Sequence, residues 1–538
     1  MVASLPANRQ RKRAYPSLLT LKIIASGCFL LALALGAVRL FNPLPPIEPR
    51  AVSYALADTG ETPLGRGAAR AMSAQPGLSG IHLLNDGRSA FAVRAMLARA
   101  AVRSLDVQYY IWHGDLSGTL LLEEVRVAAE RGVRVRLLLD DNGTRGLDVP
   151  LAALDAHPNI EVRLFNPIVL RWPRMLGLLI DPFRLNRRMH NKSFTVDNQV
   201  TVVGGRNVGD EYFGARDSRL FMDLDALAVG PVVREVSTDF DRYWNSASAY
   251  PVARILPAVP RAAAAEIAAA ARNVRQDAAA AAYINALSSL PIVEALRNGT
   301  LELTSAPVGI VSDDPVKALG AVPRGRTLWS ALTRAIGAPR RKLRLVSGYF
   351  VPTDAGVDAL ASLSQAGVEV AVLTNALRAT DVPLVHAGYA GYRVPLLRAG
   401  IRLFELSGVG AAEAAAPASR RVIGAGSDSG GSSTSSGSAL HAKTFVVDGD
   451  RLFVGLFNFD PRSHHLNTEL GFVIESPALA QFVDRGLGER LPDLTYEVRL
   501  ETDGNLVWLE RRGGEVIRHR TEPGTSLRQR VLLRLLSY

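Results

Sequence analysis

The sequence predicts an α/β fold made of two similar halves, with a functional site where the halves meet. From about residue 80 onward, apolar stretches with helical spacing alternate with short β-rich runs, which is typical of a largely buried sheet covered by helices. The order of these segments recurs from residue 327 onward. A segment with a histidine and a lysine two positions apart occurs once in each half, and such internal repetition favours duplicated units.

The first half opens with helical spacing and then alternates between strand and helix. We expect helices at 89–102 and 118–132, the second closed by Gly132, and strands at 104–112, 133–144 and 159–167. The second half repeats this order, with helices at 327–338 and 356–367 and strands at 342–352, 368–380 and 400–406. Residues 261–287 are rich in alanine and predict a helix connecting the two halves.

These segments divide the chain into six parts. The divisions are a basic flank with a membrane segment (1–45), a linker (46–79), a first lobe (80–259), a helical connector (260–315), a second lobe (316–490) and a C-terminal part (491–538). The second lobe contains a Ser/Gly-rich stretch at 424–438, which predicts a flexible loop. The C-terminal part alternates like a hairpin and ends in a basic amphipathic helix, which would lie on an anionic bilayer or dock onto the body.

The repeated segment is "HNKSFTVDNQVTVVGGRN" at 190–207, and it aligns without a gap with "HAKTFVVDGDRLFVGLFN" at 441–458. Two copies at equivalent points of equivalent halves make a chance match improbable. The aligned pairs are His190 with His441, Lys192 with Lys443, Asp197 with Asp448, Gly204 with Gly455 and Asn207 with Asn458; Gly205 follows Gly204 in the first copy.

Alternation along a strand places His190 and Lys192 on one face, and His441 and Lys443 likewise. Asp197 completes the motif, but it lies seven residues past His190, an odd offset that points it to the opposite face. We therefore interpret Asp197 and its equivalent Asp448 as turn-forming residues, although the motif counts them with its catalytic set. The glycines would allow close backbone approach.

Two imidazoles, two ammoniums and two amides brought together suit a phosphodiester. Lysines and asparagines would hold the nonbridging oxygens, one imidazole would attack phosphorus, and the other would transfer protons. A nucleophilic imidazole needs orienting through its second nitrogen. Alignment of the strands that follow each motif, "DLDALAVG" with "NTELGFVI", gives Asp225 and Glu469 as candidates. No tight cluster of metal-ligand residues is evident, so neither a metal nor another cofactor is expected.

The charge and the N-terminus favour an anionic membrane partner. The net charge is +11 and the pI about 9.9, which suits nucleic acid, an anionic bilayer or a phosphorylated substrate. Basic residues at 9–13 precede an apolar run at 23–38, which predicts an uncleaved anchor with the body outside the cytoplasm. A cleaved signal after a small-x-small site and a lipidated Cys28 are the alternatives. The single cysteine excludes an intrachain disulfide.

Residues 169–188 lead into the first motif and mix apolar side chains with arginines. This composition predicts an apolar surface ringed by arginine, through which a lipid headgroup could reach the site from a bilayer. The alternative is a core segment with solvated basic flanks. The apolar surface also argues against a nuclease, so no nucleic-acid partner is expected.

The doubled H-x-K-x4-D motif, followed by glycine and asparagine, resembles the phospholipase D superfamily. Finer features, including "SLDVQYYIW", "NRRMHNKSFTVD" and "TDVPLVHAGYAGYR", are similar to bacterial cardiolipin synthases of the C-type group. The resemblance covers about 80–500. It implies two lobes, each a mixed sheet flanked by helices and related by a pseudo-twofold axis, and it adds Asp381 and His386 near the site.

The resemblance also implies the reaction. It indicates a membrane-associated phosphatidyltransferase that works through a phosphohistidine and moves a phosphatidyl group to a lipid alcohol. Phosphatidylglycerol is the expected substrate and phosphatidylethanolamine a second candidate, while the lipid donor, the lipid acceptor and any protein partner are left open. The alternative is a phospholipase D-type hydrolase that uses water as acceptor, and a non-catalytic membrane scaffold is disfavoured because both motifs are intact.

Overall fold

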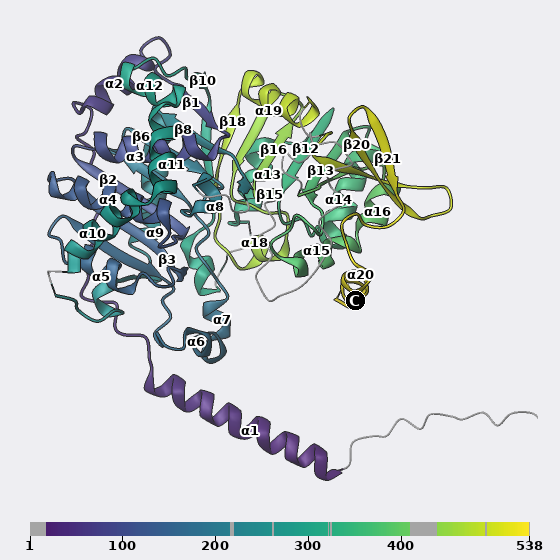
Figure 1. Ribbon diagram of the computed structural model, residues 1–538, viewed down its shortest axis with the longest axis horizontal. Helices are drawn as coiled ribbons and strands as arrows, with labels where there is room; N and C mark the ends of the chain where they lie inside the picture. Colours follow the sequence, from purple (N-terminus) through teal and green to yellow (C-terminus); the bar gives the residue numbers. More distant parts are fainter. Residues whose placement is uncertain are drawn as a thin grey trace, which may run out of the picture.

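The computed structural model describes residues 18–215, 220–260, 263–320, 322, 325–408, 438–489 and 492–536. It confirms an α/β fold of two lobes, which lie side by side in Figure 1. The basic residues at 9–13 and the Ser/Gly stretch at 424–437 lie outside the described residues.

The first lobe is built on a nine-stranded mixed sheet. The central strand β2 pairs in parallel with β3, and β3 pairs in parallel with β4, whereas all other neighbours in this sheet are antiparallel. In spatial order the strands are β10 (Thr304–Ala306), β1 (Ser79–Leu84), β8 (Asp225–Val229), β6 (Val200–Gly204), β5 (Ser193–Val196), β2 (Ser104–Ile111), β3 (Arg134–Gly143), β4 (Ile160–Phe165) and β9 (Ala249–Pro251).

The second lobe repeats the central six strands in the same order and adds three at one edge. Here β12 pairs in parallel with β13, and β13 with β14, and the other pairs are antiparallel. The order is β11 (Val308–Ser312), β18 (Leu470–Glu475), β17 (Arg451–Gly455), β16 (Lys443–Val447), β12 (Lys342–Ser347), β13 (Glu369–Asn375), β14 (Arg402–Leu406), β19 (Thr495–Leu500), β20 (Leu506–Arg512) and β21 (Glu515–His519). The expected C-terminal hairpin is thus part of this sheet.

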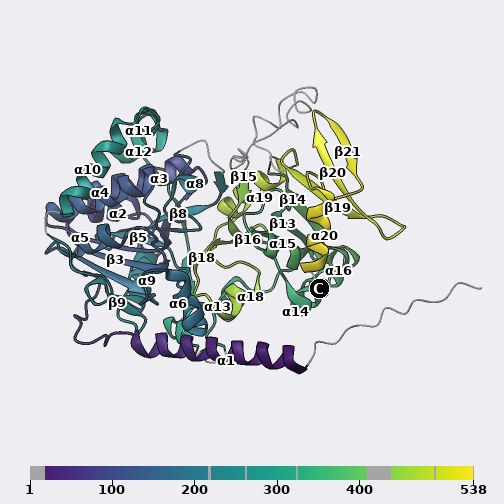
Figure 2. The same cartoon turned by 60° about the horizontal axis from the view of Figure 1, so that its bottom comes forward.

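Helices cover both faces of each sheet (Figure 2). Those of the first lobe are α2 (Pro63–Ala71), α3 (Gly87–Ala100), α4 (Leu116–Glu130), α5 (Asp148–Asp155), α6 (Arg174–Ile180), α7 (Pro182–Leu185), α8 (Asp210–Phe213) and α9 (Pro231–Trp244). Those of the second are α13 (Leu328–Ile336), α14 (Thr353–Gln365), α15 (Pro383–Ala390), α16 (Arg393–Arg398), α18 (Pro461–His465), α19 (Pro477–Glu489) and α20 (Leu527–Leu536).

The connector is not one helix. It comprises α10 (Ala263–Gln276), α11 (Ala278–Ser288) and α12 (Pro291–Asn298), which pack on α3, α4 and α5 of the first lobe. The break follows from Asp277, whose carboxylate accepts a hydrogen bond from the Ala280 N–H and caps a new helix.

The lobes meet through a shared core. Side chains of β6 and β8 pack against those of β17 and β18, with α9 and α19 at its borders; central members of this core are Val203, Ala226, Val454 and Phe472. A two-stranded parallel ladder also joins the lobes, between β7 (Leu220–Met222) and β15 (Ser438–Leu440). The site lies beside this ladder.

The N-terminal helix α1 (Leu18–Phe41) extends beneath both lobes in Figure 2 and approaches the body near α6. The sequence predicted a membrane anchor here. Within the part of the chain that the structure describes, no helix meets the length and apolarity needed to cross a bilayer.

Candidate active site

Each motif histidine is held by the backbone of the opposite lobe. The His190 N–H donates to the Thr468 carbonyl at 2.9 Å, and the His441 N–H donates to the Met222 carbonyl at 2.9 Å. The same two places carry the Met189–Thr468 bridge and the β7–β15 ladder. These reciprocal contacts are those of an approximate twofold axis, and they bring the two motif strands to one place.

The opposite lobe also supplies the carboxylate that orients each imidazole. His190 Nδ1 lies 2.7 Å from Glu469 Oε2, and His441 Nδ1 lies 2.6 Å from Asp223 Oδ2. All four side chains are buried. Because Nδ1 is occupied in both rings, Nε2 is the nitrogen left to react.

Asp225 was expected to orient an imidazole, and this prediction is wrong. The residue that contacts His441 is Asp223, two positions earlier, whereas Asp225 pairs with Arg94 at 2.8 Å. The strand register explains the error. Gly204 pairs with Asp225 in the first lobe, but Gly455 pairs with Gly471 in the second, so the structural equivalent of Glu469 is Asp223.

Gly205 makes room for this carboxylate. A Cβ on Gly205 would lie 2.0 Å from Asp223 Oδ1, so any larger residue would displace the group that holds His441. Gly455 serves backbone packing instead, because its Cβ would lie 2.7 Å from the Cα of Gly471 on the neighbouring strand.

Both motif lysines are buried at the same centre. Lys192 Nζ donates to the His190 carbonyl at 2.9 Å, and Lys443 Nζ donates to the His441 carbonyl. Burial and the nearby Lys443 ammonium hold the pKa of Lys192 well below its usual range, and burial also lowers the pKa of Lys443. Two desolvated ammoniums that repel one another gain most when an anion binds between them.

Two tyrosines that the sequence analysis did not single out line this centre. The Tyr110 ring lies 5.0 Å from the His190 ring and 5.6 Å from Lys192 Nζ. The Tyr349 ring lies 6.4 Å from the His441 ring and 5.9 Å from Lys443 Nζ. They stand near the ends of the equivalent strands β2 and β12, but aromatic residues in a strand give no signal that separates such a role from packing.

The motif asparagines secure these strand ends. Asn207 Oδ1 accepts from the Ile111 N–H at 3.2 Å and its Nδ2 donates to the Tyr212 hydroxyl at 2.9 Å. Asn458 Oδ1 accepts from the Tyr349 N–H at 3.4 Å. The amide of Asn207 is therefore already engaged, and its structural contribution is to hold β2 beside the site.

The motif aspartates bind backbone rather than the reacting groups. Asp197 Oδ1 accepts from the N–H groups of Arg103 and Ser104 at 2.7 and 3.0 Å, and Asp448 Oδ1 accepts from those of Arg341 and Lys342 at 2.7 and 3.0 Å. Both aspartates have positive φ, 50° and 54°, as a tight turn requires. Their contacts fix the starts of β2 and β12.

Asp381 and His386 are linked to the second motif through intermediate residues. Asp381 Oδ2 accepts from the Tyr349 hydroxyl at 2.6 Å. His386 is buried between Glu522, 2.6 Å away, and the Asn375 carbonyl, 3.1 Å away. Asn375 in turn bonds both the N–H and the carbonyl of Leu440, at 2.8 Å each, which fixes the residue before His441.

Protonation differs between the two histidine pairs. Burial raises the pKa of Glu469 to about 8, and burial with the Lys192 charge holds the pKa of His190 well below its usual range. Burial alone would raise the pKa of Asp223, but the neighbouring His441 lowers this pKa to about 2. At neutral pH these shifts favour an ionised Asp223 and a protonated Glu469.

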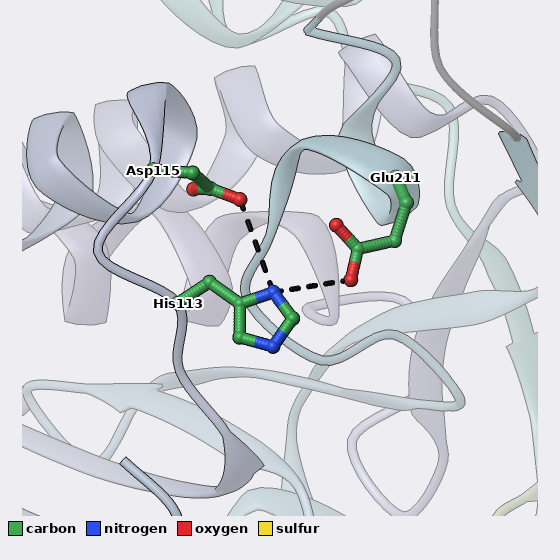
Figure 3. A group of neighbouring side chains, drawn as sticks. All are labelled: His113, Asp115 and Glu211. Carbon is green, nitrogen blue, oxygen red and sulfur yellow. Dashed lines mark ion pairs between the residues drawn. The ribbon is translucent and has the colours of Figure 1, made fainter. Parts of the chain in front are cut away.

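Among the described residues, one group has the spacing of possible metal ligands: His113, Asp115 and Glu211 (Figure 3). His113 Nδ1 lies 3.2 Å from Glu211 and 3.9 Å from Asp115. The hydrogen bond with Glu211 raises the pKa of His113. Asp115 caps α4 by accepting a hydrogen bond from the Gly118 N–H at 3.0 Å. We therefore interpret these three side chains as an ionic cluster at the start of this helix.

Comparison with known proteins assigns the family. Residues 93–244 and 332–490 match the family described as "Cardiolipin synthase, PLD-like domain". The chain is 47% identical over 465 residues to cardiolipin synthase C of Escherichia coli (strain K12), covering 86% of this chain and 96% of that protein. It is 30% identical over 504 residues to an uncharacterized Helicobacter pylori (strain 26695) protein, covering 90% and 93%.

A solved structure supports the same fold. The phosphatidylserine synthase of Haemophilus influenzae Rd KW20 superposes with a TM-score of 0.52 at 16% identity, covering 87% of this chain and 96% of that one.

The two segments that match the family, 93–244 and 332–490, contain both motif histidines and both carboxylates that orient them. The chain therefore belongs to the cardiolipin synthase family of phospholipase D-like proteins.

Proposed function

We propose that this protein is a phosphatidyltransferase that makes cardiolipin by moving a phosphatidyl group to the hydroxyl of a second lipid. The observation that carries the proposal is the pair of imidazoles, each oriented at Nδ1 from the opposite lobe, beside two buried lysines. A phosphodiester placed there meets a nucleophile, a proton donor and two cations together.

The reaction follows in two balanced steps. Nε2 of one histidine attacks phosphorus, and the P–O bond to the departing headgroup breaks while the other histidine gives its Nε2 proton to that oxygen. The hydroxyl of the second lipid then returns a proton to this nitrogen and attacks phosphorus. The P–N bond breaks, and the first imidazole is restored.

The negative charge of the substrate favours protonation of the histidine that acts as the proton donor. In the free site, burial lowers the pKa of both His190 and His441, so neither imidazole is ready to donate. A bound phosphodiester brings a negative charge that offsets Lys192 and Lys443, which lower those pKa values in the free site. The histidine facing the leaving oxygen thereby gains its proton when substrate is present.

Phosphatidylglycerol is the proposed acceptor, and phosphatidylglycerol or phosphatidylethanolamine the donor, at an anionic membrane surface. Purified protein should be incubated with vesicles of both lipids and the products analysed by mass spectrometry. Cardiolipin with released glycerol assigns the first donor, and cardiolipin with released ethanolamine the second. Phosphatidic acid alone would show a hydrolase and overturn the proposal; a His190→Ala, His441→Ala double variant is the control.

We place the body on the outer side of the bacterial inner membrane. The support is the basic run at 9–13 ahead of a single apolar segment, which is typical of a cytoplasmic N-terminus. Alkaline phosphatase fused after residue 60 is active only when exported and should report activity. An inactive fusion, together with an active cytoplasmic reporter at the same point, would place the body inside.

A further inference from the structure

The segment just before His190 forms an exposed apolar arm, which we define as residues 171–187 and which contains α6 and α7. Trp172 is 86% exposed, Met175 77%, Leu179 60% and Phe183 79%. Figure 1 shows α6 and α7 at the lower edge of the first lobe, near the end of α1. Four large apolar side chains on one short arm mark a binding surface.

The arginines of the arm do not ring this surface as the sequence suggested. Asp141 is fully buried at the end of β3 and accepts from Arg171 at 2.6 Å and from Arg174 at 2.5 Å. Arg184 pairs with Asp181 at 2.8 Å within the arm and also donates to the Pro167 carbonyl of the body at 3.0 Å. These guanidiniums face the body, so they brace the arm and leave the apolar side chains outside.

The contacts that fix the arm to the end of β3 continue toward the active site. The neighbouring Asp140 accepts from Arg188 Nε and from the Met189 N–H, both at 2.8 Å, directly before His190. Asn166 Nδ2 donates to the Arg187 carbonyl at 2.8 Å. The arm and the histidine strand are therefore tied to the same end of β3, and they keep a fixed position relative to one another.

The apolar surface extends onto α1. Leu40 and Phe41 at the end of α1 are exposed, and Arg39 lies 4.0 Å from Asp181 of the arm. A cleft of about 370 Å³ between the two elements is lined in part by Leu40, Leu170 and Ile180. Tryptophan, leucine and phenylalanine together suit a bilayer interface, and the net charge of +11 favours anionic lipids.

We propose that the arm, with the last turn of α1, inserts into the surface of an anionic bilayer and sets the depth at which His190 meets lipid headgroups. The role given to the arm rests on the proposed function, because a site that acts on lipids must be held at the bilayer. The evidence for the arm is independent of that function: it is the exposure of its apolar side chains and the ion pairs that fix it to the body.

The test is binding of the full chain to vesicles of phosphatidylglycerol and phosphatidylcholine, measured by flotation. In the arm variant Met175→Ser, Leu179→Ser, Phe183→Ser we expect binding to fall at least tenfold. The matched control Val102→Ser, Val149→Ser, Val516→Ser removes three exposed apolar side chains elsewhere and should bind like the unaltered chain. Circular dichroism and thermal melting establish that both variants are folded.

A second measurement follows Trp172 directly. Vesicles should shift its fluorescence to shorter wavelength, seen as the difference between the unaltered chain and Trp172→Phe. Unchanged binding of the arm variant, an equal loss in the control, or no shift from Trp172 overturns the proposal. Failure of lipid transfer with vesicle binding intact would count against the proposed function and leave the arm's role standing.

Discussion

The two lobes share one strand order but differ in the carboxylate that faces the partner lobe's histidine. His441 meets an aspartate with a lowered pKa, and His190 meets a glutamate whose pKa burial raises to about 8. The geometry is thus nearly symmetric while the charge is not. The difference shows that a duplicated fold can give the carboxylates behind its two imidazoles unlike protonation without changing the positions of the imidazoles.

A second difference lies in how the sheets are covered. In the first lobe, Trp244 and Phe240 of α9 close the face over β3 and β4, with Arg163 stacked 4.2 Å above the Trp244 ring. The linker joins this cover, because Arg50 donates to the Ser246 carbonyl at 2.6 Å. The equivalent face of the second lobe, beside α19, holds a cavity of about 550 Å³.

The symmetric part of the comparison is tested by removing each imidazole. His190→Ala and His441→Ala should each lower kcat at least about 10³-fold, because nucleophile and proton donor cannot substitute for one another. Cardiolipin formation measures this loss. The variant that still traps labelled lipid as a covalent adduct retains the nucleophile, and substantial turnover by either variant would contradict the two-histidine mechanism.

The asymmetric part is tested by neutralising each carboxylate at pH 7. Asp223→Asn removes a charge that is present and should lower kcat/KM about 10²-fold or more, whereas Glu469→Gln replaces a group that is already protonated and should cost less.

The pH profile sharpens this test. As pH rises through about 8, Glu469 loses its proton, and the new buried negative charge opposes binding of the phosphate, so kcat/KM should fall. Glu469→Gln should shift this decline to higher pH. An unchanged profile would show that Glu469 does not titrate there.

The motif aspartates should affect stability more than chemistry. Asp197→Asn weakens bonds to a buried backbone and should cost about 1–3 kcal/mol of unfolding free energy. Asp448→Asn should cost less, because its bonds lie nearer solvent. Thermal melting measures both. A normally melting Asp197→Asn variant without activity would contradict this assignment.

The smallest effect is expected at the His113 cluster. A chelator should leave activity unchanged, and His113→Ala should stay within about twofold of the unaltered enzyme, since the proposed steps use only imidazoles and ammoniums. Activity that a chelator removes and a divalent ion restores would make this cluster, or another ion site, part of the mechanism.

Sequence periodicity was enough to predict the two lobes, the strands that carry the motifs and the turn positions of Asp197 and Asp448. It missed Asp223 because a two-residue shift of register preserves strand alternation, so Asp225 aligns equally well. It also missed the crossed pairing, since the partners lie 279 and 218 residues apart. Sequence alone did not show that Arg171 and Arg174 of the arm face inward, because their buried partner, Asp141, belongs to an earlier strand.

The crossed carboxylates have a consequence for how the protein is made. While the ribosome has not yet released the second lobe, His190 lacks Glu469 and Asp223 has no His441 to hold. A nascent or truncated chain therefore carries no assembled phosphate chemistry. The site can therefore assemble only after the second lobe has been synthesised.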